Sequence, residues 1–248
     1  MNARSLIQNM FQRLGWDVRR VGYPSSEELL LARFLTVTRP TVVFDVGANV
    51  GQYGMSLRKC GFAGRIVSFE AIASVHARLA AVAAQDGNWT VAPRCALGRT
   101  PGKACINVAA NSVSSSLLSM NDLHVDAAPA SRYVTSETVP VRRLDDVAET
   151  RLDKSAKLLL KIDTQGYEEE VLAGASRVLD SVIAMQLELS LMPLYKGAPT
   201  LRRMLELCED LGFELYGLIP GFYDEKTARL LQMDGLFVKI TPPSASDR

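Results

Sequence analysis

The sequence predicts an α/β fold in which a doubly wound, parallel sheet is covered by helices on both faces. Two observations carry this prediction. From residue 41 onward, short apolar runs alternate with segments of helical periodicity of about ten to fifteen residues. The composition, 48% hydrophobic and 22% charged over 248 residues, is that of a globular chain long enough for one large domain.

Residues 1–40 are expected to form an N-terminal helical extension. A first helix is indicated by apolar residues at helical spacing, namely Leu6, Ile7, Met10, Phe11 and Leu14. A second helix is expected after Ser25, because Glu28 follows at the spacing of a capping box and an apolar run comes next.

The domain itself is expected to span residues 41–241. Its seven strands are expected at 42–46, 65–70, 89–96, 158–163, 183–190, 213–219 and 236–240. Helices are expected between them at 51–60, 74–84, 167–179 and 200–211. Residues 242–248 hold nothing to bury, so this tail is expected to be disordered.

Residues 97–150 interrupt the alternation of strands and helices. They hold two short candidate strands, at 104–109 and 138–141, and a serine-rich stretch over 111–119. We interpret this region as an inserted hairpin and loop that faces the substrate, because loops carried on a rigid scaffold commonly hold binding residues.

Charge and cysteine content exclude several classes of protein. Lys and Arg number 28 against 27 Asp and Glu, so a net charge of +1 disfavours a nucleic-acid partner. The four cysteines form no C-x-x-C pair and have no histidine at metal-ligand spacing, which argues against disulfides and structural zinc. A membrane span needs about 18 or more consecutive apolar residues, and no apolar run in the sequence comes close to that length. A cytoplasmic protein is expected.

The first forty residues suggest one further partner. They hold six arginines against three acidic residues, a local charge of +3, beside the apolar stripe of the first helix. Such a helix could lie on an anionic membrane surface as a peripheral contact. The alternative is that the stripe packs on its own domain and the charged face is solvated.

The most informative motif is a glycine-rich turn at the end of the first strand. Asp45, Gly47, Asn49 and Gly51 lie in the pattern D-x-G-x-x-x-G. Asn49 takes the place of the middle glycine of a dinucleotide fingerprint, and no G-K-[ST] of a phosphate-binding loop follows. The pattern instead fits a loop around the amino-acid part of S-adenosylmethionine, with Asp45 near its ammonium group.

A second acid supports the same ligand. Glu70 ends the next strand, where a carboxylate can accept hydrogen bonds from both ribose hydroxyls. The alternative is a glycine-rich turn between strand and helix that binds no ligand.

At these residues the sequence resembles the FkbM family of S-adenosylmethionine-dependent O-methyltransferases. The resemblance rests on 45–51, on Phe69-Glu70, on Ala96-Leu97-Gly98, on 114–117, on 144–146 and on the block 161–168, Lys-Ile-Asp-Thr-Gln-Gly-Tyr-Glu. It implies a Rossmann-like methyltransferase sheet and a donor site that includes Ala96. Gln165 departs from the family pattern, which has Glu there. The stretch 186–195 is similar to a branch that acts on sugar hydroxyls of actinobacterial glycolipids.

Methyl transfer to a hydroxyl needs orientation and a base. Asp163 is the leading candidate for the base because it ends the fourth strand at the edge that holds the donor turn; the alternative is that it caps the next helix. Lys161, in an apolar run, is expected to pair with an acid such as Glu188. His124, in the insertion, is a second candidate for proton transfer, with a solvated loop histidine as its alternative.

Other interpretations stay open. Glu188 could join Asp163 in holding a divalent cation, or form a structural ion pair, and no metal site is assigned. The acceptor is expected to be a small molecule or a lipid-linked sugar, and the sequence assigns neither its identity nor an oligomeric state. Two alternative functions are a non-catalytic module that binds S-adenosylmethionine and an NAD-dependent oxidoreductase, which Asn49 disfavours.

Overall fold

The computed structural model describes residue 10 and residues 27–148, 151–153 and 155–240. The expected first helix, apart from Met10, lies outside this part of the chain. The expected tail over 242–248 lies outside it as well.

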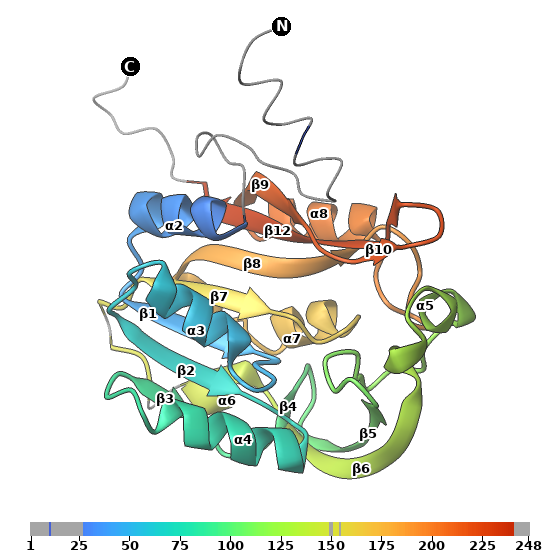
Figure 1. Ribbon diagram of the computed structural model, residues 1–248. Helices are drawn as coiled ribbons and strands as arrows, with labels where there is room; N and C mark the ends of the chain where they lie inside the picture. Colours follow the sequence, from blue (N-terminus) through green and yellow to red (C-terminus); the bar gives the residue numbers. More distant parts are fainter. Residues whose placement is uncertain (1–9, 11–26, 149–150, 154, 241–248) are drawn as a thin grey trace, which may run out of the picture.

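A seven-stranded sheet forms the centre of the protein, in the order β3-β2-β1-β7-β8-β12-β9 (Figure 1). Its strands are β1 (Val42–Val46), β2 (Arg65–Phe69), β3 (Trp89–Val91), β7 (Leu158–Ile162), β8 (Val182–Ser190), β9 (Phe213–Pro220) and β12 (Gln232–Lys239). Strand order reverses between β1 and β7, which places a switch point beside the glycine-rich turn. The doubly wound α/β fold predicted from the sequence is confirmed.

Two strands differ from the sequence prediction. The run 89–96 forms two strands, β3 and β4 (Ala96–Leu97), in different sheets, because Pro93 between them has no N–H to continue a ladder. β12 begins at Gln232 and runs antiparallel to both neighbours. It follows β9 through the short hairpin β10 (Tyr223–Asp224) and β11 (Arg229–Leu230), and a connection without a crossover helix reverses the chain.

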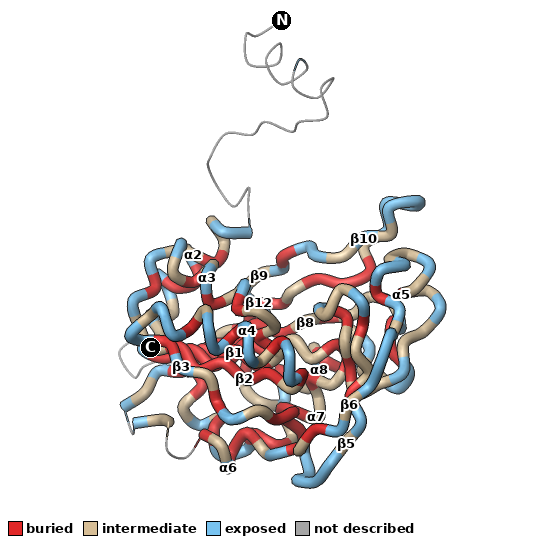
Figure 2. The backbone as a smooth tube through the Cα atoms, turned by 60° about the horizontal axis from the view of Figure 1, so that its bottom comes forward, coloured by how far each residue is buried: buried red, intermediate tan, exposed pale blue. Residues whose placement is uncertain are grey.

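Helices cover both faces of the sheet and enclose two cores. One face carries α2 (Glu27–Thr38), α3 (Gln52–Lys59) and α4 (Ala73–Ala83). The other carries α6 (Leu144–Ala148), α7 (Glu168–Ala173) and α8 (Leu201–Asp210). Burial is concentrated in the strands between these layers, as Figure 2 shows.

One predicted helix, 167–179, is shorter than expected. It ends with α7 at Ala173 and resumes only as the 3-10 turn η2 (Val178–Asp180). A Cβ at Gly174 would lie 2.3 Å from the Gly98 carbonyl oxygen, so the chain there packs directly on another backbone segment.

The helix α2 is part of the domain's packing. Its side chains Leu31, Phe34 and Leu35 are buried in the core cluster that also contains Val43 and Ile219. Residues 27–38 therefore pack with the sheet that the sequence predicted to begin at residue 41. Among the described residues, no helix is long and apolar enough to cross a membrane.

The insertion forms a small sheet beside the main one. Strands β5 (Gly102–Ala109) and β6 (Tyr133–Arg142) form the expected hairpin, and β4 pairs with β6. Helix α5 (Asp122–Ala127) and the 3-10 turn η1 (Pro129–Ser131) lie between β5 and β6 in sequence. The insertion lies at the end of the main sheet toward which β1, β2 and β7 point (Figure 1). It therefore closes one side of the switch point.

Candidate active site

A cleft of about 320 Å³ lies at the carboxyl ends of β1, β2 and β7, and the middle of β8 borders it. Its size is within the range of small-molecule sites. Its walls come from the turn after β1, the ends of β2 and β7, β8, β12, the segment 112–117 of the insertion, and the front of α3. The cleft has two ends, one at the glycine-rich turn and one beside β8 and β12, which we call the donor end and the acceptor end.

The glycine-rich turn is held in place by its backbone conformation. Gly47, Asn49 and Gly51 have φ values of +74°, +47° and +95°. Asparagine tolerates this left-handed region, which explains how Asn49 replaces a glycine without changing the turn. The Asn49 side chain donates a hydrogen bond to Ser112 Oγ at 3.2 Å, so it also ties the turn to the insertion.

Gly47 is required for close packing as well as for its φ angle. A Cβ at this position would lie 1.8 Å from the carbonyl oxygen of Asp163. The ends of β1 and β7 therefore leave no space for a Cβ at Gly47, and any side chain there would force them apart.

Glu70 is buried at the end of β2 and organises the donor end. Its carboxylate accepts hydrogen bonds from the N–H groups of Asn49 (2.9 Å), Ala71 (2.8 Å) and Ile72 (2.8 Å). Burial raises its pKa, and these three N–H groups act in the opposite direction. A carboxylate offers about four acceptor positions, so one remains, on Oε2, for a ribose hydroxyl.

An apolar wall adjoins Glu70. It is lined by Phe69, Ile72, Cys95, Ala96 and Leu97, all of them buried. The structure thus places the predicted donor residues Gly47, Asn49, Glu70 and Ala96 together on one end of the cleft, with Gly51 one turn behind them. An apolar wall beside a carboxylate fits an adenosine group.

Asp45 does not line the cleft with these residues. Its side chain is fully buried beneath the turn, 3.3 Å from Lys161 Nζ, and Ser68 Oγ donates to it at 3.4 Å. Burial raises the pKa of Asp45, and Lys161 lowers it. Asp45 therefore pairs with Lys161 beneath the turn and does not line the donor end.

Lys161 has partners other than the one expected from the sequence. Its ammonium group pairs with Asp45 and, at 3.4 Å, with Asp163 Oδ2, and not with Glu188. Register explains this, because β1 lies next to β7 and Asp45 is directly opposite Lys161. Burial alone would lower the pKa of Lys161, but the surrounding carboxylates raise it, so the lysine stays charged.

Asp163 lines the cleft and does not cap the next helix. Its Oδ1 accepts a hydrogen bond from Gln165 Nε2 at 2.8 Å, and its Oδ2 faces Lys161. No side chain caps α7, and Glu168, its first residue, instead holds the preceding turn, since its carboxylate accepts from the N–H groups of Thr164 (2.8 Å) and Gly166 (3.1 Å). The Asp163 side chain is 35% exposed and can therefore reach an acceptor molecule.

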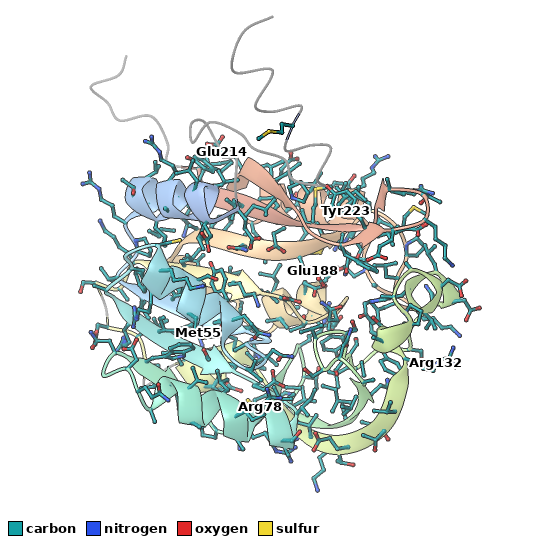
Figure 3. All side chains as sticks on the ribbon, in the orientation of Figure 1. Met55, Arg78, Arg132, Glu188, Glu214 and Tyr223 are labelled. Atoms are coloured by element: carbon teal, nitrogen blue, oxygen red, sulfur yellow. The ribbon has the colours of Figure 1, made fainter. Side chains whose placement is uncertain are left out.

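Two hydrogen-bonded chains, each of a tyrosine, a glutamine and acids, lie at the acceptor end, and Tyr195 and Glu188 stand behind the residues that line it. In one, the Tyr195 hydroxyl donates to Gln165 Oε1 at 2.6 Å, and Gln165 Nε2 donates to Asp163 and to Glu188. The other chain joins residues of α3, β8 and β12. Figure 3 labels Glu188 on β8, on the side toward β7 and α7.

The second chain runs from α3 to β12. The Tyr53 hydroxyl donates to Gln186 Oε1 at 2.9 Å, and Gln186 Nε2 donates to Asp234 Oδ2 at 2.8 Å. Burial, followed by repulsion from Asp163, raises the pKa of Asp234 to about 6. Burial and the same neighbour raise the pKa of Glu188 well above its usual range.

His124 is neither solvated nor at the cleft. It lies in α5 with 3% of its surface exposed, its ring 5.2 Å from those of Tyr195 and Phe222. Burial lowers its pKa to about 4, and its Nδ1 has no hydrogen-bond partner. The structure does not bring it to Asp163, and its contact with Tyr195 links it to the acceptor end only through packing.

Tyr195, Gln186 and Asp234 had no assigned role in the sequence analysis. Gln186 and Asp234 are polar residues with apolar neighbours on buried strands, which is the local signal that could have identified them. Tyr195 carries no such signal, because its hydroxyl reaches Gln165 only through the folding of a loop. In the described part of the chain, no group of three or more His, Cys, Asp or Glu residues could hold a metal ion.

The fold and this cleft define an α/β methyltransferase. The family model "Methyltransferase FkbM domain" matches residues 45–215, well over half of the chain, and the protein belongs to the FkbM methyltransferase family. The family makes it an S-adenosylmethionine-dependent methyltransferase. A search of curated proteins finds no match.

Three solved structures that resemble the chain are distant from it in sequence. An rRNA methylase from Streptococcus thermophilus is 9% identical, with 89% of this chain and 100% of that chain covered and a TM-score of 0.48. A precorrin-6y C5,15-methyltransferase from Geobacter metallireducens is 13% identical, with 90% and 94% covered and a TM-score of 0.46. Fibrillarin from Aeropyrum pernix, with natively bound S-adenosyl-L-methionine, is 12% identical, with 79% and 66% covered and a TM-score of 0.45.

Proposed function

We propose that the protein transfers a methyl group from S-adenosylmethionine to a hydroxyl of a sugar, carried on a glycolipid or a related secondary metabolite. The observation that carries the proposal is Asp163, which faces the cleft with each carboxylate oxygen held by a separate partner. Oriented in this way, the carboxylate can accept the proton of an acceptor hydroxyl as the new bond forms.

The residues at the donor end fit S-adenosylmethionine. Glu70 has one acceptor position left for a ribose hydroxyl, Ala96 and its neighbours form the apolar wall, and Gly47 keeps the turn free of a side chain. When bound, the donor supplies an electrophilic methyl group. The chain's own contribution is to orient the acceptor and to take up its proton.

The walls of the acceptor end favour a neutral acceptor with several hydroxyls. Asp163, Gln165, Gln186 and Asp234 line it with carboxylates and amides, which pair well with hydroxyl groups. Among the described lining residues, Lys161 carries the positive charge, and it is engaged by Asp45 and Asp163. A phosphate or carboxylate group on the acceptor would therefore meet repulsion.

A comparison of extracts tests the acceptor. Glycolipids and small molecules are extracted from cells with and without the gene and compared by mass, and purified protein is then given labelled donor and the candidate that changed. We expect a sugar-containing compound that is lighter by one CH₂ group per missing methyl when the gene is absent. Labelling of an amine or an acidic compound, with no sugar labelled, would contradict the proposal.

Contact with a membrane belongs to the same proposal. A lipid-linked acceptor would require the protein to work at the membrane surface, and the arginines of the first forty residues would favour an anionic leaflet. Most of these residues lie outside the described part of the chain. Flotation of the full-length protein with anionic vesicles at low salt tests the contact, and protein that stays at the bottom of the gradient contradicts it.

A further inference from the structure

Gln165 occupies the space between two carboxylates at the acceptor end. Its Nε2 lies 2.8 Å from Asp163 Oδ1 and 2.8 and 2.9 Å from the two oxygens of Glu188. A primary amide has two N–H groups, so it can donate to both acids at once. The amide thus stands where a cation would have to sit to bind the same two carboxylates.

The direction of this amide is set by Tyr195. The tyrosine hydroxyl, on a side chain only 1% exposed, donates to Gln165 Oε1 at 2.6 Å. A rotated amide would point its oxygen at two carboxylates and repel both. The backbone is held as well, since Ser116 Oγ donates to the Gln165 carbonyl at 2.8 Å and Gln165 has a φ of +56°.

The acids around Gln165 repel one another. Glu188 faces Asp163, Glu168 and Asp234, and the pKa of Glu188 is raised by burial and by these neighbours. The amide satisfies Glu188 and the near oxygen of Asp163, and Lys161 satisfies the far oxygen of Asp163. The Asp163 carboxylate is therefore held by Gln165 on one oxygen and by Lys161 on the other, while its exposed surface faces the cleft.

We propose that Gln165 is a positioning residue that takes the place of a cation at the acceptor end, cross-linking Asp163 and Glu188 so that Asp163 stays aimed at the acceptor hydroxyl. The role of Asp163 toward an acceptor hydroxyl rests on the proposed function, whereas the cross-link between Asp163 and Glu188 does not. The same geometry has a second consequence. A glutamate at position 165 would place a third carboxylate beside Asp163 and Glu188, and three such groups form a site for a hard divalent cation.

The first arm of the test measures metal binding and needs no acceptor. Full-length wild type, Gln165→Glu and the matched control Gln85→Glu, at an exposed position, are titrated with Mn²⁺ by calorimetry. We expect Gln165→Glu to bind Mn²⁺ at least ~10-fold more tightly than the other two proteins, and Gln165→Glu combined with Glu188→Gln to lose this gain. Equal affinity in Gln165→Glu and the control would overturn the inference.

A thermal measurement keeps this arm decisive if the variant is unstable. The repulsion of three carboxylates should lower the melting temperature of Gln165→Glu, and Mn²⁺ should restore it, whereas the melting temperature of Gln85→Glu should not respond. Loss of stability that Mn²⁺ does not restore contradicts the three-carboxylate geometry. Because this arm uses no acceptor, its result stands even if the protein methylates something other than a sugar.

The second arm measures positioning with the acceptor found for the enzyme. Gln165→Met has a similar length but cannot donate a hydrogen bond. We expect kcat to fall ~10-fold or more with little change in the donor Kd or in the KM for the acceptor, because Asp163 loses the N–H donor that holds one of its oxygens in place. An unchanged kcat in a folded Gln165→Met protein, or a rise in KM alone, would show that the amide only fills space.

Discussion

The two ends of the cleft are built from different kinds of groups. At the donor end, the turn after β1 and the segment between β2 and α4 present backbone N–H groups to one carboxylate, that of Glu70. At the acceptor end, hydrogen bonds run between side chains, from Tyr195 to Gln165 to Asp163 and Glu188. The first end depends on the path of the chain, and the second depends on side chains that come from separate elements.

This difference predicts how each end responds to substitution. A change of backbone shape should destroy the donor end, and at Gly47 it should also displace the end of β7, because a Cβ there would clash with the Asp163 carbonyl. A change of charge or hydrogen bonding at the acceptor end should leave the turn intact and slow the reaction. Substitutions at the two ends should therefore separate donor binding from turnover.

The largest effect is expected from Gly47→Ala. Its Cβ would lie 1.8 Å from the Asp163 carbonyl, and alanine is strained at a φ of +74°. We expect affinity for S-adenosylhomocysteine, measured by calorimetry, to fall ~10²-fold or more, together with a lower melting temperature. Gly87→Ala, where a Cβ meets open space, is the control and should bind normally. Normal binding by Gly47→Ala would mean that the donor does not use this turn.

Asp163→Asn should have the next largest effect, and at the other end. The amide keeps the size of the side chain but cannot take up a proton, so we expect turnover to fall ~10²-fold or more while donor affinity stays within about 2-fold. Asp210→Asn, on the exposed end of α8, is the matched control. A folded Asp163→Asn protein that turns over at the normal rate would exclude Asp163 as the base.

Glu70→Ala should weaken the donor end without abolishing it. The variant loses a charged acceptor for three N–H groups and for the ribose, and a lost hydrogen bond to a charged group costs ~1.5 to 3 kcal/mol. Donor affinity should therefore drop about 10- to 100-fold in calorimetry, with kcat at saturating donor much less affected. Glu214→Ala, at an exposed position, serves as the control, and equal affinities in the two variants would remove Glu70 from the donor site.

The smallest effect on turnover is expected from His124→Phe. The native histidine is buried and neutral, because burial lowers its pKa from 6.5 to about 4. The unfolded chain takes up a proton first as pH falls, so stability is lost between these two values, by at most ~3 kcal/mol. Phenylalanine removes this loss, and the melting temperature of the variant should fall less between neutral pH and about pH 5. A folded variant with turnover reduced ~10²-fold would instead give His124 a role in proton transfer.

Much of the donor end was predictable from the sequence because it is local. Gly47, Asn49 and Gly51 lie within five positions of one another, and their glycine and asparagine character reports directly on the left-handed backbone of the turn. Glu70 could be added because parallel strands end at the same edge of a sheet. The doubly wound class followed from the regular alternation of strands and helices, whereas the strand order, with the antiparallel β12 between β8 and β9, came from the structure.

Only the tertiary structure decided the partners at the acceptor end. Lys161 pairs with Asp45 rather than Glu188 because β1, and not β8, places a carboxylate directly opposite it. Asp163 meets Gln165 and Glu188 through a left-handed turn that no pattern in an apolar strand reports. Charges buried in a sheet pair across strands far apart in sequence, so their residue types can be read along the chain, but their partners depend on strand order and register.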